Sequence, residues 1–323
     1  MAAIRDLPLF TTEYDRASEF QLPESASYIY AVTSEPRSGF AAELQVDTPS
    51  ARFVRITQDD SAAHFETDLP GHERLPVRMR SAIERFLGDL GAGAVYLDIT
   101  GLGHQVWAPL VRVCLETGIR LNVVYLEPET YSSTAHAELG TIFDLSERTD
   151  GIRPLPLFAT LSDERPETSC FVPLLGFEGA RFLQMLNEVE PAKGKVFPIV
   201  GVPGFRPHYP LDALIGNAVG LEQDKAIRNL RFARSNCPFS LYHEIQDIAD
   251  RAPNDQIRLG LIGTKPHALG AILFAIANDD RTEIIYDNAR RKVGRTSGTA
   301  KCLVYAVSDF LPPSRWSPRR PVT

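Results

Sequence analysis

The sequence IRLGLIGTKPHALGAILFAIANDDRTEIIY, residues 257–286, decides the fold expected for this chain. An apolar run from Ile257 to Ile262 enters a turn at Gly263, and apolar residues at helical spacing from Leu269 to Ile276 precede a second apolar run. Strand, helix and strand in this order form a crossover, and continuous apolar strands are typical of parallel sheets covered on both faces. The stretch therefore predicts a βαβ unit.

A second stretch has the same order of elements. The apolar runs 94–99 and 121–126 enclose the glycine turn 100–104 and a helical pattern through Trp107 and Val111. Similar spacing indicates either an internal duplication or two independent units that share the geometry of this motif, and the sequence leaves both interpretations open.

The remaining patterns extend the α/β interpretation. Short β-rich runs between Ser25 and Leu69 predict a meander or hairpins, and a helix is expected from near Pro76 to Gly91. Further on, the apolar runs 171–175 and 195–200 each enter a glycine turn.

The chain is long enough for two domains, with 323 residues. The best linker candidate is the polar, proline-rich segment 148–168. We therefore expect a β-rich segment plus a Rossmann-like domain over residues 1–155, a second Rossmann-like α/β domain over 156–311, and a mobile, proline-rich tail over 312–323. The fold class predicted is α/β, with two Rossmann-like parallel-sheet halves and a β-rich N-terminal segment.

The composition is that of a globular protein, with 44% apolar and 23% charged residues. The net charge of −7 disfavours a general nucleic-acid coat, which needs a basic surface. The four cysteines are far apart, so neither a zinc site nor a disulfide framework is predicted. Without a leader-like amino terminus or a membrane-length apolar run, we expect a cytoplasmic protein and no membrane partner.

Four glycine turns follow predicted strands and precede predicted helices, where backbone N–H groups attract anions. Each turn alone is equally consistent with an ordinary strand-to-helix connection. Together they supply candidate ligand-binding residues: Gly101, His104, Glu178, Arg181, Arg206, Gly263, Thr264 and Lys265. The carboxylates of Asp98 and Glu178 would act as acid or base if they share the site.

Standard motifs are missing from these turns. The sequence contains no GxxxxGK[ST] and no GxGxxG after a strand, which disfavours a conventional nucleoside triphosphatase or nicotinamide dehydrogenase. It also has no GxSxG and no HExxH. We therefore expect neither a cofactor nor a metal.

The turn Gly263-Thr264-Lys265-Pro266-His267 is the most distinctive, because a lysine and a histidine start one predicted helix. Lys265 would supply positive charge, and His267 would bind phosphate or transfer a proton, so both are candidate catalytic residues. The alternative is a solvent-facing histidine in an ordinary helix start.

A basic stretch runs from Asn288 to Lys301 without an acidic residue and includes Arg291 and Arg295. As a flexible cationic loop it would close over a polyanion, and we count both arginines as candidate ligand-binding residues. The alternative is a solvated connection between two strands.

The turn Gly263-Thr264-Lys265, with a weaker echo in Asp98-Ile99-Thr100-Gly101, resembles the CRISPR-associated Rossmann fold (CARF) sensor domains, over some 30 residues around each turn. The resemblance implies that a cyclic oligonucleotide binds across a dimer interface, that Thr264 and Lys265 contact its phosphate, and that the chain forms a homo-oligomer. Some isolated domains of this kind cleave their ligand.

The sequence thus predicts a nucleotide- or phosphate-ligand-binding sensor or processing protein, with a role in bacterial antiviral defence. Two alternatives stay open: a non-catalytic scaffold that binds a protein partner, and a sugar-phosphate or nucleoside enzyme. The sequence does not decide whether a reaction is catalysed.

Overall fold

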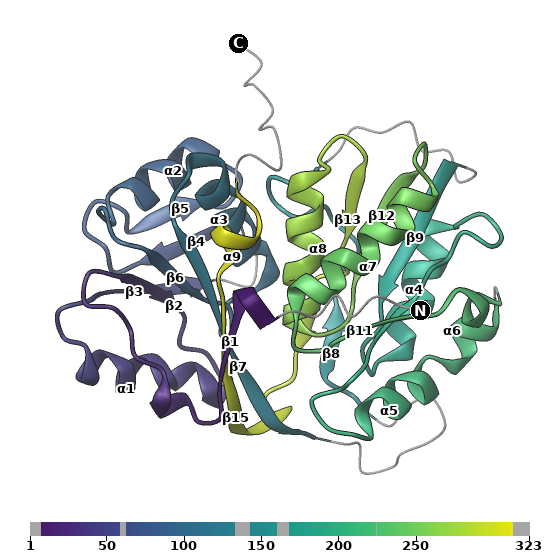
Figure 1. The fold of residues 1–323 in the computed structure, drawn as a ribbon, viewed down its shortest axis with the longest axis horizontal. Coiled ribbons are helices and arrows are strands. Elements are labelled where there is room, and N and C mark those ends of the chain that lie inside the picture. The colour runs from purple at the N-terminus through teal and green to yellow at the C-terminus, as the bar shows by residue number, and fades with distance from the viewer. Residues whose placement is uncertain (1–7, 59–62, 133–142, 160–167, 224, 313–323) are drawn as a thin grey trace. The chain divides into compact units, whose positions relative to one another are not determined.

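The computed structural model describes residues 8–58, 63–132, 143–159, 168–223 and 225–312. Contacts divide the chain into two compact units (Figure 1). We call residues 131–295 the central unit and residues 7–130 together with 296–323 the terminal unit. The amino-terminal residues and nearly all of the expected tail lie outside the described residues.

The central unit is built on a five-stranded sheet in the order β11-β10-β9-β12-β13. Its strands are β9 (Ser169–Leu174), β10 (Ile199–Gly201), β11 (Arg231–Ala233), β12 (Gln256–Leu261) and β13 (Thr282–Ile285). All four neighbouring pairs are parallel. In chain order this is the 3-2-1-4-5 arrangement of a doubly wound Rossmann-like fold.

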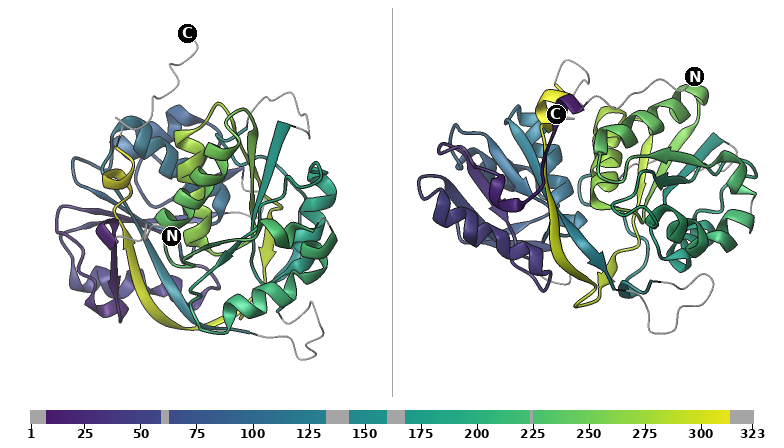
Figure 2. Two further views of the ribbon diagram at one scale, coloured as in Figure 1. Left: turned by 45° about the vertical axis from the view of Figure 1, so that its right-hand side comes forward. Right: turned by 60° about the horizontal axis from the view of Figure 1, so that its bottom comes forward.

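Helices connect these strands and cover the sheet on both faces (Figures 1 and 2). One face carries α4 (Gly179–Val189), α5 (Tyr209–Gly216) and α6 (Ala218–Gln223); the other carries α7 (Pro238–Arg251) and α8 (Lys265–Ala277). The expected helix after Gly263 is thus confirmed. It is buried from Lys265 to Ile276, and its sequence from Ala268 to Ile276 is apolar throughout, as burial on all sides requires.

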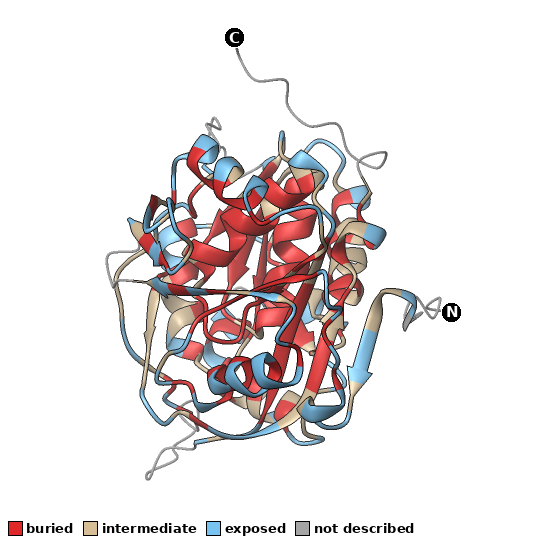
Figure 3. Ribbon diagram, turned by 90° about the vertical axis from the view of Figure 1, so that its left-hand side faces the viewer, coloured by how far each residue is buried: buried red, intermediate tan, exposed pale blue. Residues whose placement is uncertain are grey.

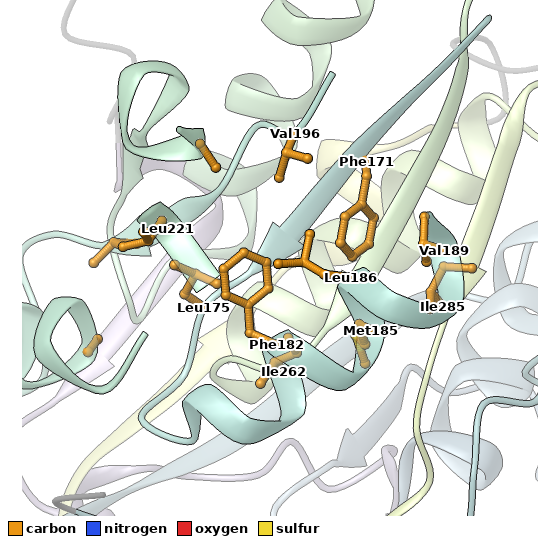
Figure 4. Close-up of a cluster of buried hydrophobic side chains, with 13 residues drawn as sticks. Phe171, Leu175, Phe182, Met185, Leu186, Val189, Val196, Leu221, Ile262 and Ile285 are labelled. Carbon is orange, nitrogen blue, oxygen red and sulfur yellow. The ribbon is translucent and has the colours of Figure 1, made fainter. Parts of the chain in front are cut away.

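The core beneath α4 joins helix and strand residues that the apolar spacing singles out. Phe182, Met185 and Leu186 of α4 pack against Phe171 of β9 and Ile285 of β13 (Figure 4). The glycine at position 260 makes room for this layer, because a Cβ there would lie 3.1 Å from the Phe171 ring. Full burial of one such apolar side chain stabilises the fold by about 2 kcal/mol.

The terminal unit contains an eight-stranded sheet in the order β1-β15-β7-β6-β2-β3-β4-β5. Its strands are β1 (Thr11–Tyr14), β2 (Ser27–Tyr30), β3 (Arg52–Gln58), β4 (His64–Thr67), β5 (Arg74–Pro76), β6 (Val95–Asp98), β7 (Leu121–Tyr131) and β15 (Thr296–Tyr305). Strands β3, β2, β6 and β7 are parallel to one another, and β4 and β5 extend the sheet antiparallel. Figure 2 shows the long strands β7 and β15 side by side.

The terminal unit's helices are α1 (Phe40–Asp47), α2 (Arg80–Gly88), α3 (His104–Thr117) and α9 (Val307–Phe310). The crossover from β6 through α3 to β7 confirms the second βαβ prediction. Buried residues concentrate on the strands and on the helix sides that face them (Figure 3). No helix among the residues described is both long and apolar enough to span a bilayer.

Several local expectations need correction. The segment 25–69 is not simply a meander, because α1 connects β2 to a parallel β3. Strand β4 then pairs antiparallel with β3. The helix expected near Pro76 begins at Arg80, since Pro76 ends β5. The basic stretch 288–301 is largely β14 (Ala289–Arg291) and β15, with β14 paired to β8 (Ser146–Thr149).

The units divide the chain at 130/131 and 295/296 rather than at 155/156. The physical reason is that β15 returns to the terminal unit and lies between β1 and β7. The described part of the expected linker, including β8, belongs to the central unit; residues 160–167 lie outside the described residues.

Candidate functional site

The order of the central sheet places its switch point between β9 and β12, where consecutive connections leave in opposite directions. In open α/β sheets, ligands bind at this point, outside the carboxyl ends of the strands. The turns at Gly176 and Gly263 follow β9 and β12, and the Gly201 turn follows β10. Three of the four predicted turns therefore meet at one edge of one sheet.

Contacts within the chain explain why glycine occupies positions 176 and 263 at this edge of the sheet. A Cβ on Gly176 would lie 2.7 Å from the carbonyl oxygen of Ile262, and one on Gly263 would lie 3.1 Å from that of Leu175. The two turns therefore pack backbone against backbone across the switch point. Close approach of one turn to the other already requires glycine there, whether or not a ligand binds.

Thr264 caps helix α8 and ties it to the next loop. Its hydroxyl accepts a hydrogen bond from the backbone N–H of His267 (3.2 Å) and donates one to the carbonyl of Ser235 (2.8 Å). Threonine is a favoured N-cap because its oxygen satisfies an unpaired N–H of the first turn. The cap fixes the start of α8 beside the loop that follows β11.

His267 lies in the first turn of α8 and is buried. Its Nε2 lies 3.0 Å from the carbonyl oxygen of Arg234, which can only accept, so this nitrogen carries the proton. Burial lowers the pKa of His267 to about 4, against the smaller opposite effect of its backbone hydrogen bonds. A covered, neutral ring that holds a loop has the geometry of a positioning residue rather than of a general base.

Lys265 occupies the first position of the same helix and is 7% exposed. An ammonium group at the positive end of a helix dipole is disfavoured, whereas an anion there interacts favourably with both the charge and the helix start.

Arg181, from the first turn of α4, extends across the carboxyl ends of β12 and β13. Its Nε and Nη2 each donate to Asp287 at 2.7 Å, and Nη1 donates to Glu178 at 3.3 Å. Burial lowers the pKa of Arg181, but the hydrogen bonds and charges of Asp287 and Glu178 outweigh it and raise the pKa. The guanidinium of Arg181, which the sequence predicts to bind a ligand, is thus hydrogen-bonded to the carboxylates of Asp287 and Glu178.

Glu178 anchors the segment before β8. Its Oε1 accepts from the backbone N–H groups of Leu145 (2.9 Å) and Ser146 (2.8 Å), and its Oε2 accepts from the Ser146 hydroxyl (2.9 Å). With Arg181 as a further donor, the carboxylate is occupied by structural hydrogen bonds. It does not have the geometry of a general acid or base.

Arg291 and Arg295 gather at the same edge as Arg181. All three lie close enough to the phenol of Tyr286, directly after β13, to lower its pKa, although burial is the larger effect and raises it. Arg291 lies opposite Ser146 in the β14–β8 ribbon. The charges of all three arginines act on Tyr286, a residue that the sequence did not single out.

Three further basic residues of the stretch form ion pairs. Arg290 donates to Asp150 at 2.7 Å, and Lys292 pairs with Asp144. Lys301 lies in β15 of the terminal unit and donates to Glu13 at 2.8 Å. The expected cationic loop is thus a strand ribbon with neutralising partners at several positions.

Arg206 lies in the turn after β10, three residues before α5 begins. Its carbonyl accepts from the N–H of Tyr209 (3.1 Å), and the residue is half-buried. It shares the sheet edge with the other turns.

The fourth turn, at Gly101, belongs to the terminal unit, so Gly101 and His104 are on a different sheet. A Cβ on Gly101 would lie 2.3 Å from the carbonyl oxygen of Ala31. Gly101 follows β6 and Ala31 follows β2, so two turns again pack closely at the switch point of a sheet. Asp98 accepts from the Tyr28 hydroxyl (3.0 Å) and from the N–H of Thr100 (2.8 Å). Burial and the charge of Asp98 raise the pKa of Tyr28 well above its usual value.

Further buried polar groups near the Gly101 turn are hydrogen-bonded within the chain. Glu35 accepts from Arg37 (2.9 Å) and from the hydroxyl of Thr296 (2.5 Å), and Thr100 accepts from the N–H of Leu126 (3.0 Å). Asp98 is therefore a structural carboxylate, and hydrogen bonds within the chain account for the polar groups named here.

Among the residues that the structure describes, no three His, Cys, Asp or Glu side chains are grouped as metal ligands. Buried cysteines at 114, 170 and 302 have their thiol pKa raised to about 12, in each case mainly by burial. Cys114 and Cys302 serve as small apolar residues of the core, whereas the thiol of Cys170 donates to Asp255 (3.2 Å).

Comparison with known proteins adds little to this geometry. No protein-family model matches the chain, and no curated protein matches it. Among solved structures the chain is similar to CobK precorrin-6A reductase, with 14% identity over 84% of this chain and 91% of that one and a TM-score of 0.24. A likeness at this level carries no argument. The class, a Rossmann-like α/β protein, follows from the sheet topology.

Proposed function

We propose that the central unit binds a nucleotide or another phosphate-bearing ligand at the carboxyl edge of its five-stranded sheet. The observation that carries the proposal is the attachment of the segment bearing Arg291 and Arg295 to the Gly176 turn. The N–H of Lys292 donates to the carbonyl of Leu145 (3.0 Å), and the N–H of Leu145 donates to Glu178 of that turn (2.9 Å). Guanidinium groups suit phosphate oxygens, and the start of α4 adds oriented N–H groups.

The proposal assigns separate roles to the predicted residues. Lys265, Arg291 and Arg295 contact the anionic group, with Arg206 at the adjoining turn. Arg181 and Glu178 hold the edge together, and Thr264 and His267 fix the start of α8. Gly101 and His104, in the other unit, take no part.

Isothermal titration of the full chain with mononucleotides, cyclic oligonucleotides and ribose 5-phosphate tests the proposal. We expect Arg295→Ala and Lys265→Ala each to weaken binding about tenfold or more, as loss of a charge-assisted contact does. Arg251→Ala and Lys193→Ala are matched controls, because α7 and α4 end at the opposite edge of the same sheet. No binding of any ligand, or equal loss in variants and controls, would contradict the proposal.

The resemblance to CARF sensor domains makes cyclic oligonucleotides the first ligands to try and extends the proposal to a sensor in antiviral defence. Mass spectrometry of the ligand after incubation separates a sensor, which returns it intact, from a processing enzyme, which does not. Light scattering with and without ligand tests the proposed homo-oligomer.

A further inference from the structure

A cluster of aromatic rings lies beside the Gly176 turn. Phe177 stacks on Phe143 with ring centroids 4.3 Å apart and meets Tyr209 and Tyr131 edge to face at 5.1 and 5.5 Å. We call Tyr131, Phe143, Phe177 and Tyr209 the aromatic cluster. Phe143 and Tyr209 are buried, whereas Phe177 and Tyr131 are half-buried.

The cluster comes from separate connections rather than from one helix face. Phe177 follows the turn after β9, Tyr209 begins α5, Tyr131 ends β7, and Phe143 precedes β8. The main core of the unit forms a different cluster, beneath α4 (Figure 4). The rings therefore lie at the loop edge of the sheet, where ligands bind in this fold, and Phe177 also packs against the margin of the core beneath α4.

Cationic residues are bound to the same segments. Ser132, next to Tyr131, donates its N–H to the carbonyl of Arg295 (2.9 Å) and its hydroxyl to that of Gly294 (2.8 Å). Asp144, next to Phe143, pairs with Lys292, whose N–H also donates to the carbonyl of Leu145 (3.0 Å). The segment 292–295 is thus fixed on both sides to the backbone that carries the rings.

We infer that the aromatic cluster stacks the base of a nucleotide whose phosphate is held by Arg291 and Arg295. The inference rests on the proposed function and narrows its ligand to a compound that carries both a flat aromatic base and a phosphate. Aromatic rings offer a base a stacking surface, and arginine supplies phosphate contacts beside it. A sugar phosphate has no base and would contact only the phosphate-binding arginines, Arg291 and Arg295.

The test compares two ligands that differ in the base. Full-length protein is titrated with 2-aminopurine riboside 5′-monophosphate, whose fluorescence falls on stacking, and with ribose 5-phosphate by calorimetry. We expect quenching, and an affinity for the nucleotide at least tenfold above that for the sugar phosphate. Unlabelled adenosine, which lacks the phosphate, should compete with the fluorescent nucleotide, whereas ribose should not.

Variants separate the two halves of the site. Phe177→Leu should weaken nucleotide binding about tenfold and leave ribose 5-phosphate binding unchanged, whereas Arg295→Ala should weaken both. Phe232→Leu is the matched control, because Phe232 is half exposed on the edge strand β11 of the same sheet. Circular dichroism checks that each variant is folded.

The outcomes distinguish this inference from the proposed function. Equal affinity for both ligands in the wild type, or no competition by adenosine, overturns base stacking while phosphate binding stands. If neither ligand binds and the cyclic oligonucleotides do not bind either, both base stacking and the proposed function are overturned. The wild-type measurements decide the question even if Phe177→Leu does not fold.

Discussion

Arg181 and Asp287 form an ion pair with two hydrogen bonds of 2.7 Å, although 106 positions separate them in the sequence. Asp287 is fully buried and the Arg181 side chain is 14% exposed. The pair joins the start of α4 to the end of β13. Because burial of unpaired charge is costly, each partner depends on the other.

Arg181→Met should lower the free energy of unfolding of the central unit by about 3–5 kcal/mol, because it leaves the Asp287 carboxylate buried without its cation. Arg148→Met is the control, since the Arg148 side chain is 62% exposed in its pair with Asp150 and its loss should cost less than about 1 kcal/mol. Urea denaturation followed by circular dichroism measures both. Adding Asp287→Leu to Arg181→Met should restore part of the loss; a further decrease would contradict this account.

His267 should make the protein sensitive to acid. Its pKa is about 4 in the folded protein, below the ordinary value of 6.5, so the unfolded chain binds more protons between these values. Its contribution is therefore fully present above about pH 6.5 and is lost as the pH falls through about 4, with a total near 3 kcal/mol.

Urea denaturation at several pH values measures this contribution. The difference in stability between wild type and His267→Gln should shrink as the pH falls from 7 to 4. His208→Gln, at a side chain that is 64% exposed, is the control for replacement of a histidine. Parallel curves for wild type and His267→Gln would show that the buried ring does not titrate in this way.

Gly101→Ala should destabilise the terminal unit by about 2 kcal/mol, because the new Cβ would lie 2.3 Å from the backbone oxygen of Ala31 and one of the two loops must shift. Gly88→Ala is the matched control in the same unit. It ends α2 and has open space around it, so alanine should be neutral or stabilise by up to about 1 kcal/mol. Thermal unfolding ranks the two variants, and the reverse order would exclude the crowding explanation.

One thiol per chain should react rapidly with Ellman's reagent in the native state. Three of the four cysteines are buried, whereas Cys237, at the N-cap of α7, is half-buried. Cys237→Ser should remove the rapid reaction and retain an oxygen that caps the helix. Rapid labelling that persists in this variant would mean that a buried cysteine becomes exposed.

The order of local elements was predictable because apolar runs and their spacing are local properties of the sequence. Both βαβ units, and the helix through Phe182 and Met185, follow from such patterns. The division into two units was not predictable from the sequence. It depends on the pairing of β15 with β1 and β7, which are far from it in the sequence. The polar, proline-rich composition of 148–168 predicted a domain boundary at 155/156, but the residues described on both sides of it belong to the central unit.

The sheet edge that carries the glycine turns was predictable from the sequence, but the contacts of its residues were not. Glycine turns after apolar strands correctly indicate the sheet edge, but a glycine needed for loop contact and one needed for a phosphate are the same residue in a sequence. An arginine such as Arg181 likewise gives no local sign that Asp287 already binds it. Tyr286 and Phe177 were missed because single aromatic residues beside apolar strands look like ordinary core.

The return of β15 to the terminal sheet also sets an order of events during synthesis. Strand β1 is made early, yet β15, its antiparallel partner, leaves the ribosome only after the whole central unit. The central unit can therefore fold on the nascent chain while β1 and β7 still lack the strand that lies between them. A stalled or prematurely terminated chain would carry an assembled central unit and two open strand edges, the kind of surface that chaperones shield and aggregates recruit.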